Sequence, residues 1–426
     1  MFDAEQILSA LFSRRRVMMI RRATGVLLAA LVIAAAGCRR EAAKPGELTP
    51  AQKREMDALV ARLTDEEREG YLGAAAWTLC HCATEEGNRR AGKVFEVIGE
   101  YVNGKPAAAA ALGGAKGIRK GFRELLRDPD PVVRGFAAMA LAVFDDRESK
   151  SEIARLLKPD PSLKNEPSVE YFARFDRSRA AMALGMMGAA EYAADLAALL
   201  KSEDGDVRMG AAQGLGHLKA RAYVKEIAAL LRDDHDKARA AAAGALAELG
   251  AREYAKDIAG LLEASGDSMV YESALRALVQ HKAKGQVPEI AKLLGEEFRR
   301  DEACKALALL GVSEHAKEIA GLLDSPSPQT RMAALMSLGI LNAREYEKQV
   351  AEHLQDREEY VRPDAALALV LMGSKEHARE ATEAFEKERD YLLSYQRCRI
   401  PLEELRKLRS RADANLKVLR REMGKP

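Results

Sequence analysis

The chain has 426 residues and a formal net charge of +2, with 31% of its residues charged and 48% hydrophobic. This near balance of charge excludes the strongly basic field of a nucleic-acid-binding protein, so we expect no nucleic-acid partner. The hydrophobic share excludes a disordered chain. Aromatic residues make up only 5% of the chain, so a core has to be assembled from many contacts between small aliphatic side chains.

The N-terminal segment has the pattern of an export signal. Arg21 and Arg22 precede an apolar run over residues 26–36, which ends in Gly37 and Cys38. Such a run is too short to span a bilayer, which takes about 20 apolar residues. A charged segment followed by an apolar segment and small residues is instead typical of a cleaved signal peptide.

The Ala-Ala-Gly-Cys end of this segment resembles the lipobox of bacterial lipoproteins, in which the signal is cut before the cysteine and that cysteine is acylated. The resemblance implies a lipid on Cys38 and an exported protein that faces the periplasm or cell exterior, with the lipid as its only membrane anchor. We predict a signal peptide over residues 1–37, with Met18 or Met19 as alternative starts, followed by a tether over residues 38–50.

Residues 51–114 lack the regular pattern that follows them, so we expect an irregular helical N-terminal cap. The cluster Cys80-His81-Cys82 would need further ligands to hold a metal, and we interpret it as core packing. Cys304 and Cys398 lie about three repeats apart, roughly 30 Å, which is too far for a disulfide. We therefore predict neither a metal site nor a cofactor.

A segment of about 31 residues recurs from residue 115 to residue 390. We mark each copy by the second residue of a Leu-Leu pair or its equivalent, at Leu126, Leu157, Leu200, Leu231, Leu262, Leu294, Leu323, Leu354 and Phe385. One longer step holds Lys164 to Phe175, which we interpret as a loop insertion. Recurrence at this interval indicates stacked supersecondary units.

Each unit contains two short helical patterns. The first is Ala-rich and ends at Gly, as over residues 207–216, while the second carries Leu and Ile on one face, as over residues 254–262. Small side chains let neighbouring helices approach closely, and the branched side chains fill the space between layers.

The pattern V-R-x-x-A-A-x-x-L-G, followed by a second helix and LL-x-D, resembles the short HEAT-like repeats found in phycobilin lyases and many bacterial scaffold proteins. The resemblance implies an all-α fold, an α-solenoid of about nine HEAT-like helix pairs over residues 115–390. Ankyrin and tetratricopeptide repeats fit less well, because their signature residues are missing.

An arginine opens most of the first helices. It recurs at Arg134, Arg179, Arg208, Arg239, Arg331 and Arg362. A column of this kind is either a basic stripe for an acidic partner or a ladder of contacts to carboxylates and turn carbonyls that ties one unit to the next. We favour the ladder, because the position and the period match the turns.

The second helices carry a basic column and an acidic column side by side. In HEAT-like arrays these helices usually line the concave side, so the resemblance implies a groove of mixed charge that selects a partner by polar complementarity. The candidate binding residues are Lys225, Glu226, Lys256, Asp257, Lys317, Glu318, Lys348, Arg379 and Glu380. The alternative is a solvated face that only keeps the protein soluble.

No catalytic motif accompanies the repeat. The sequence has no P-loop, no H-E-x-x-H and no G-x-S-x-G. Deoxyhypusine hydroxylase, an enzyme built on the same kind of repeat, forms a di-iron site from His-Glu dipeptides, and this sequence has none. We predict a non-catalytic scaffold for an unknown protein partner. The alternative is an enzyme of the lyase or hydroxylase type.

The C-terminal residues 391–426 are predicted to form a basic amphipathic helix. Its apolar positions are Leu405, Leu408, Ala412, Leu416, Leu419 and Met423. A helix of this kind either meets anionic lipid or an acidic partner, or caps the last repeat with its apolar stripe. We favour the cap.

Overall fold

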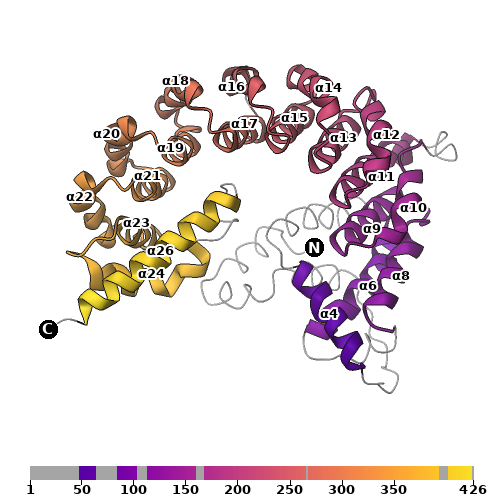
Figure 1. Cartoon of the computed structure of the whole chain (residues 1–426), viewed down its shortest axis with the longest axis horizontal. Coiled ribbons are helices and arrows are strands. Elements are labelled where there is room, and N and C mark those ends of the chain that lie inside the picture. The colour runs from indigo at the N-terminus through magenta and orange to yellow at the C-terminus, as the bar shows by residue number, and fades with distance from the viewer. Residues whose placement is uncertain are drawn as a thin grey trace, which may run out of the picture. The chain divides into compact units, whose positions relative to one another are not determined.

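The computed structural model describes residues 48–63, 84–102, 113–159, 167–264, 267–392 and 402–424. Every element in these residues is a helix (Figure 1), which confirms the all-α prediction. None of these helices combines the length and apolar character that a membrane span requires. The chain divides into two compact units, one ending at Glu226 and the other beginning at Ile227.

The first unit stacks its helices in two layers. Its helices are α4 (Pro50–Leu63), α6 (Glu85–Val102), α8 (Ala115–Leu125), α9 (Pro131–Val143), α10 (Lys150–Arg155), α11 (Pro167–Met186), α12 (Ala193–Leu199) and α13 (Gly205–His217), with α14 (Val224–Ala229) at the junction. Helix α11 packs against α9 on one side and α13 on the other, while α10 and α12 pack on α11 and α13. Helices α4 and α6 pack against α8, ahead of the regular stack.

The second unit repeats the same arrangement. Its helices are α15 (Asp236–Glu248), α16 (Ala255–Ala264), α17 (Ser268–His281), α18 (Val287–Lys292), α19 (Arg300–Leu309), α20 (Ala316–Ala320), α21 (Pro328–Leu341), α22 (Glu347–Glu352), α23 (Arg362–Met372), α24 (Ala378–Leu392) and α26 (Leu402–Met423). The odd-numbered helices α15 to α23 pack in succession, and α16, α18, α20 and α22 each pack on the next of them. This alternation is the predicted solenoid of helix pairs.

Most second helices are short because 3-10 turns flank them. The leading turns are η1 (Arg147–Ser149), η3 (Ala190–Tyr192), η4 (Arg221–Tyr223), η6 (Arg252–Tyr254), η7 (Lys284–Gln286), η9 (Ser313–His315) and η11 (Arg344–Tyr346). The trailing turns are η5 (Leu230–Arg232), η8 (Leu293–Gly295), η10 (Gly321–Asp324) and η12 (His353–Gln355). Such tight turns close the ends of helices that are only one or two turns long.

Each first helix has its own stop signal. A left-handed residue follows it at Asp145, Gly188, Lys219, Gly250, Lys282, Gly311, Asn342 and Gly373. The next amide then bonds back across the turn, as from Ala251 to the Leu246 carbonyl at 3.0 Å, which satisfies an otherwise open helix end. The predicted glycine stop therefore covers only half of these positions. Lys, Asn and Asp adopt the same conformation at the others.

The predicted loop over Lys164 to Phe175 is wrong for most of its length. Helix α11 begins at Pro167 and continues to Met186. Proline is well suited to the first turn of a helix, because its missing amide hydrogen has no partner there in any case. The extra residues therefore lengthen a first helix instead of forming an edge loop.

Glycine lets α11 and α13 approach very closely. A Cβ atom on Gly214 would meet the Ala181 carbonyl oxygen far inside van der Waals contact, and one on Gly185 would lie 2.5 Å from Gly214 Cα. Further along the stack the first helices use alanine, and six of the seven Ala residues from Ala238 to Ala247 in α15 are at most 5% exposed. This is the small-residue packing that the sequence predicted.

Candidate binding surface

The second-helix columns consist of charged side chains that are exposed in each repeat that carries them. All nine candidate residues are exposed, from Lys225 and Glu226 to Arg379 and Glu380. The residue that follows each charged pair turns inward: Ile227, Ile258 and Ile319 are all fully buried. The helix thus directs one side into the core and presents the charged pair to solvent.

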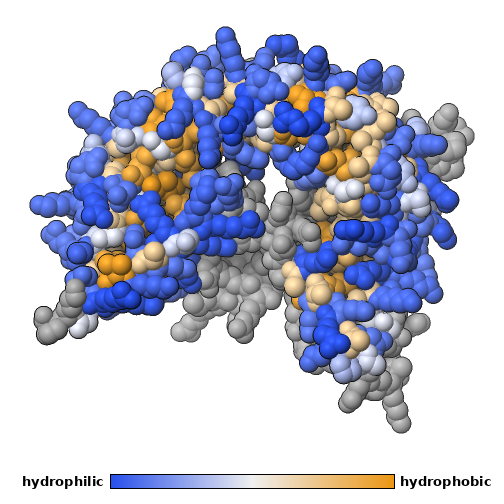
Figure 2. All heavy atoms as spheres, in the orientation of Figure 1, coloured by the Kyte–Doolittle hydropathy of each residue, from blue (hydrophilic) through white to orange (hydrophobic). Residues whose placement is uncertain are grey.

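The predicted placement of these columns on a concave side is wrong for the second unit. Figure 1 shows α16, α18, α20 and α22 along the outer side of the curve that this unit makes, with α17, α19 and α21 inside it. Figure 2 shows hydrophilic side chains along the same outer helices. Sequence periodicity identifies the two rows, but it does not say which way the stack bends.

The acidic column is partly engaged inside the row itself. Arg232 Nη2 donates to Asp257 at 3.1 Å, and Gln355 Nε2 donates to Glu380 at 3.0 Å. Each donor ends one second helix and each acceptor begins the next. Glu318 contacts His315 at the start of its own helix. Asp257 and Glu380 therefore connect neighbouring repeats, through exposed contacts worth roughly 0–1 kcal/mol each.

The basic column differs from the acidic column in this respect. Lys225, Lys256, Lys317, Lys348 and Arg379 are exposed and form no ion pair or hydrogen bond with any described residue. Proline at position 288 interrupts the column in α18. The surface therefore offers unpaired cations beside carboxylates that are largely occupied, which favours an anionic group as its ligand.

The arginine column is the predicted ladder. Arg134, Arg208, Arg239, Arg331 and Arg362 each donate to the carbonyl six residues earlier, in the turn that precedes their helix. Two of them also reach the next repeat, where Arg134 Nη2 lies 2.6 Å from Asp176 and Arg331 Nη2 lies 2.7 Å from Asp356. The ladder prediction is confirmed at these five positions.

The pKa values of the two carboxylate acceptors, Asp176 and Asp356, shift in opposite directions. Burial raises the pKa of Asp176 to about 6, although the charge and hydrogen bonds of Arg134 act against it. Burial also acts to raise the pKa of Asp356. There, hydrogen bonds from Arg331, the Glu358 amide and His353 prevail and hold the pKa well below its ordinary value. The extra donors at Asp356 account for the difference.

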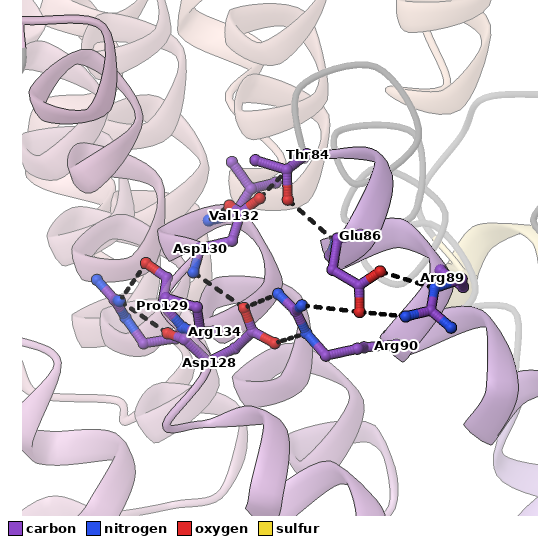
Figure 3. A network of polar contacts seen from close by, with 10 residues as sticks. Thr84, Glu86, Arg89, Arg90, Asp128, Pro129, Asp130, Val132 and Arg134 are labelled. Atoms are coloured by element: carbon purple, nitrogen blue, oxygen red, sulfur yellow. Dashed lines mark hydrogen bonds and ion pairs between the residues drawn. The ribbon is translucent and has the colours of Figure 1, made fainter.

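A polar network joins α6 to the first regular helices (Figure 3). Asp130 caps α9 through the Val132 amide at 2.9 Å and also accepts from the Thr84 amide at 2.6 Å. Beside it, Asp128 accepts from Arg90 Nε at 2.5 Å and Nη2 at 2.8 Å. The residues before the regular array are therefore fastened to its first unit, as a terminal unit requires.

Phe298 is an exposed aromatic residue that the sequence pattern did not single out. Phe298 is 89% exposed in the turn before α19, and Tyr271 donates to its carbonyl at 3.1 Å. Arg299 lies over the Tyr271 ring and donates to the Leu262 carbonyl at 2.7 Å. The backbone is thus held while the ring faces solvent. The only sequence signal is an aromatic in a turn where other repeats carry Asp, Ser or Pro.

The cysteine predictions fall mostly outside the described residues. Cys38, the Cys80-His81-Cys82 cluster and Cys398 all lie outside them. Cys304 is buried in α19, where desolvation raises the pKa of its thiol to about 12. Across the described part of the chain, no group of three or more His, Cys, Asp or Glu side chains is arranged to hold a metal ion.

A family model of HEAT repeats matches residues 176–237, 287–370 and 316–396. These ranges coincide with the helix pairs of the stack, so the predicted HEAT-like repeats are confirmed there. No curated protein matches the sequence.

Several solved structures are similar to the chain at low identity. The complex of CpcE and CpcF of phycocyanin lyase from Nostoc sp. PCC7120 is 22% identical, with 53% of this chain and 94% of that chain covered and a TM-score of 0.37. An engineered protein is 21% identical, with 98% and 99% covered and a TM-score of 0.32. YIBA_ECOLI is 14% identical, with 70% and 92% covered and a TM-score of 0.36. Because these identities and TM-scores are low, the fold is assigned from the packed helix pairs and from the match to the HEAT-repeat model.

Proposed function

Because the chain carries HEAT repeats over residues 176–237 and 287–396, we propose that it is a non-catalytic scaffold that binds a partner protein along its second-helix columns. The observation that carries this proposal is the basic column. Lys256, Lys317, Lys348 and Arg379 are exposed and unpaired, whereas Asp257 and Glu380 are held by neighbouring repeats.

The spacing of the basic column indicates how far apart the anionic groups of the partner should lie. Packed helices lie about 8–10 Å apart, so Lys317 and Lys348 in consecutive repeats present cations at roughly that interval. A partner with carboxylates or phosphorylated side chains at a similar spacing can pair with several of them at once. Rim cations of this kind act chiefly on the rate of association and on its salt dependence.

The test is capture of partners from the native membrane fraction by full-length chain and by a triple variant, Lys256→Gln, Lys317→Gln and Lys348→Gln. A matched control replaces the exposed cations Lys93, Lys116 and Lys120 of the N-terminal helices by Gln. We expect the column variant to lose its partner and the control to retain it. Equal capture by all three proteins would exclude the column as the binding surface.

The alternative is an enzyme of the lyase or hydroxylase type that uses the repeat surface as its active site. Metal analysis and absorption spectroscopy of the purified full-length chain separate the two possibilities. A stoichiometric metal ion or a bound bilin would overturn the scaffold proposal. A colourless, metal-free protein that still captures its partner would support it.

We also propose that Cys38 is acylated and anchors the exported protein to a membrane. The support is the charged, apolar and Gly-Cys order of residues 21–38. Cys38→Ser should abolish incorporation of labelled palmitate and move the protein out of the membrane fraction. Unchanged labelling of the variant would show that Cys38 is not the attachment site.

A further inference from the structure

Helix α26 uses its apolar stripe inside the second unit. Leu405, Leu408, Ala412, Leu416 and Leu419 are at most 6% exposed, and the helix packs against α23 and α24. Arg411 donates to the carbonyls of Gly339, Ile340 and Leu371, and Asn415 donates to those of Val370 and Leu371. The helix is therefore fixed across the ends of α21 and α23, and its apolar face is not free to enter a membrane.

The opposite side of α26 carries a strip of cations. Arg406, Lys417 and Arg421 are exposed and form no ion pair or hydrogen bond with any described residue. At about 100° per residue the three lie within roughly 60° of one another around the helix. We name Arg406, Lys417 and Arg421 the basic strip.

The neighbouring acidic groups are mostly occupied. Glu403 and Glu404 pair with Lys407, at 2.9 Å and 2.8 Å. Asp413 contacts Arg389, while Glu386 of α24 accepts from Arg420 Nη2 at 2.5 Å. Glu422 lies 3.7 Å from Lys375. Because these carboxylates already have cationic partners, the strip keeps its positive field.

We propose that the basic strip docks on an anionic lipid surface, with α26 lying parallel to the membrane. This goes beyond the partner binding proposed above and involves different residues. A helix of 22 residues presents a straight edge of about 33 Å, which matches a plane. Basic residues near an anionic bilayer each contribute about 1 kcal/mol, or roughly fivefold in affinity.

The residues between the cations favour lipid over an acidic protein. Ser410 and Ala414 are small and exposed, and Val418 is 48% exposed. Helix α26 has no aromatic side chain beside these cations, so it offers no Trp or Tyr anchor of the kind that protein interfaces use. It does allow the cations to approach phosphate headgroups closely, with Val418 placed to enter the interface. Figure 2 shows mostly hydrophilic atoms along the visible side of α26.

The experiment is sedimentation with vesicles, using the full chain with Cys38→Ser so that no acyl chain contributes. One set of vesicles is pure phosphatidylcholine, and the other contains phosphatidylglycerol as about a third of its lipid. The variant carries Arg406→Gln, Lys417→Gln and Arg421→Gln. The matched control carries Lys93→Gln, Lys116→Gln and Lys120→Gln, which removes the same charge from exposed positions of the N-terminal helices.

We expect binding to the anionic vesicles only, weakened by salt, and lowered on the order of 100-fold in the strip variant. The control variant should bind as the parent does. Equal loss in both variants, binding to both kinds of vesicle, or no binding by the parent would each overturn the proposal. Binding of polyglutamate through the strip without vesicle binding would assign it to an acidic protein instead. Circular dichroism checks that the variants remain folded.

Discussion

Arg331 and Asp356 form a two-point ion pair between consecutive repeats, with Arg331 Nε 2.9 Å from Asp356 Oδ2 and Nη2 2.7 Å from Oδ1. Each side chain is only 3% exposed. Removing one partner of a buried pair leaves the other charge uncompensated. We therefore predict that Arg331→Met lowers the free energy of unfolding by about 3–5 kcal/mol, measured by denaturant titration.

The control for this change is Lys348→Met, because Lys348 is exposed and unpaired. It should alter the free energy of unfolding by less than about 0.5 kcal/mol. Adding Asp356→Leu to Arg331→Met should recover part of the loss, since the second change removes the unpaired carboxylate. A loss at Arg331 no larger than that at Lys348 would show that the pair does not hold these repeats together.

The lowered pKa of Asp356 gives the stability a pH dependence of known sign. Hydrogen bonds from Arg331, the Glu358 amide and His353 outweigh burial and keep its pKa below the ordinary 3.8. The contribution of ionised Asp356 to stability is present above pH 3.8 and is lost as the pH falls from there toward the lower pKa of the folded state. We predict that Asp356→Asn flattens the fall in melting temperature between about pH 5 and about pH 2.5. This range extends roughly one pH unit to either side of 3.8.

Asp176 should act in the opposite sense. Burial raises its pKa from 3.8 to about 6, so its contribution is fully present below 3.8 and is lost as the pH rises toward 6. The stability of the unchanged protein should therefore fall as the pH rises from 3.8 toward 6, and Asp176→Asn should remove that fall. Thermal unfolding of both variants across one pH series, extended from about pH 2.5 to about pH 7 so that it passes the raised pKa of Asp176, compares them directly. Parallel pH profiles would contradict the assignment.

The close approach of α11 and α13 predicts a sharp contrast between two glycines. A Cβ at Gly214 would collide with the Ala181 carbonyl, whereas one at Gly244 in α15 has no atom within 4 Å. Gly214→Ala should cost about 1–3 kcal/mol through overpacking. Gly244→Ala should stabilise by about 0.5–1 kcal/mol, because alanine loses less backbone entropy in a helix. Calorimetry on both variants tests this, and the same sign for both would refute it.

The periodic features were predictable from sequence, and the reason is physical. Arg134 and Arg331 stand at the same place in their repeats, so one turn geometry accounts for both. The buried stripe of α26 followed in the same way from helical spacing, since Leu405 and Leu416 share one face.

Other features depend on tertiary context that periodicity does not contain. Lys282 and Asn342 end their helices in the left-handed conformation, where only glycine was expected, because capping bonds and packing outweigh the local preference. Pro167 begins a helix instead of a loop. The direction in which the stack bends is set by small rotations between repeats, so the outer position of the charged columns in the second unit had no signal in the sequence.

The attachment of α26 depends on Arg411, whose guanidinium reaches three carbonyls at 2.6–2.9 Å. Burial lowers the pKa of Arg411, and the nearby charge of Arg344 adds to this effect, but the group stays cationic and complements the negative ends of α21 and α23. Charged hydrogen bonds of this kind are worth about 1.5–3 kcal/mol. We predict that Arg411→Met loosens α26 by at least that amount, seen as faster amide exchange over residues 402–423.

The comparison variant is Arg421→Met, on the exposed side of the same helix. It removes the same charge without touching those carbonyls and should leave the exchange rates unchanged. If Arg411 acts by capping, the exchange of the last turns of α21 and α23 rises together with that of α26, because their carbonyls lose their donor. Faster exchange confined to α26 would mean that Arg411 holds this helix without capping α21 and α23. Unchanged exchange in α26 would mean that the apolar stripe alone holds the helix in place.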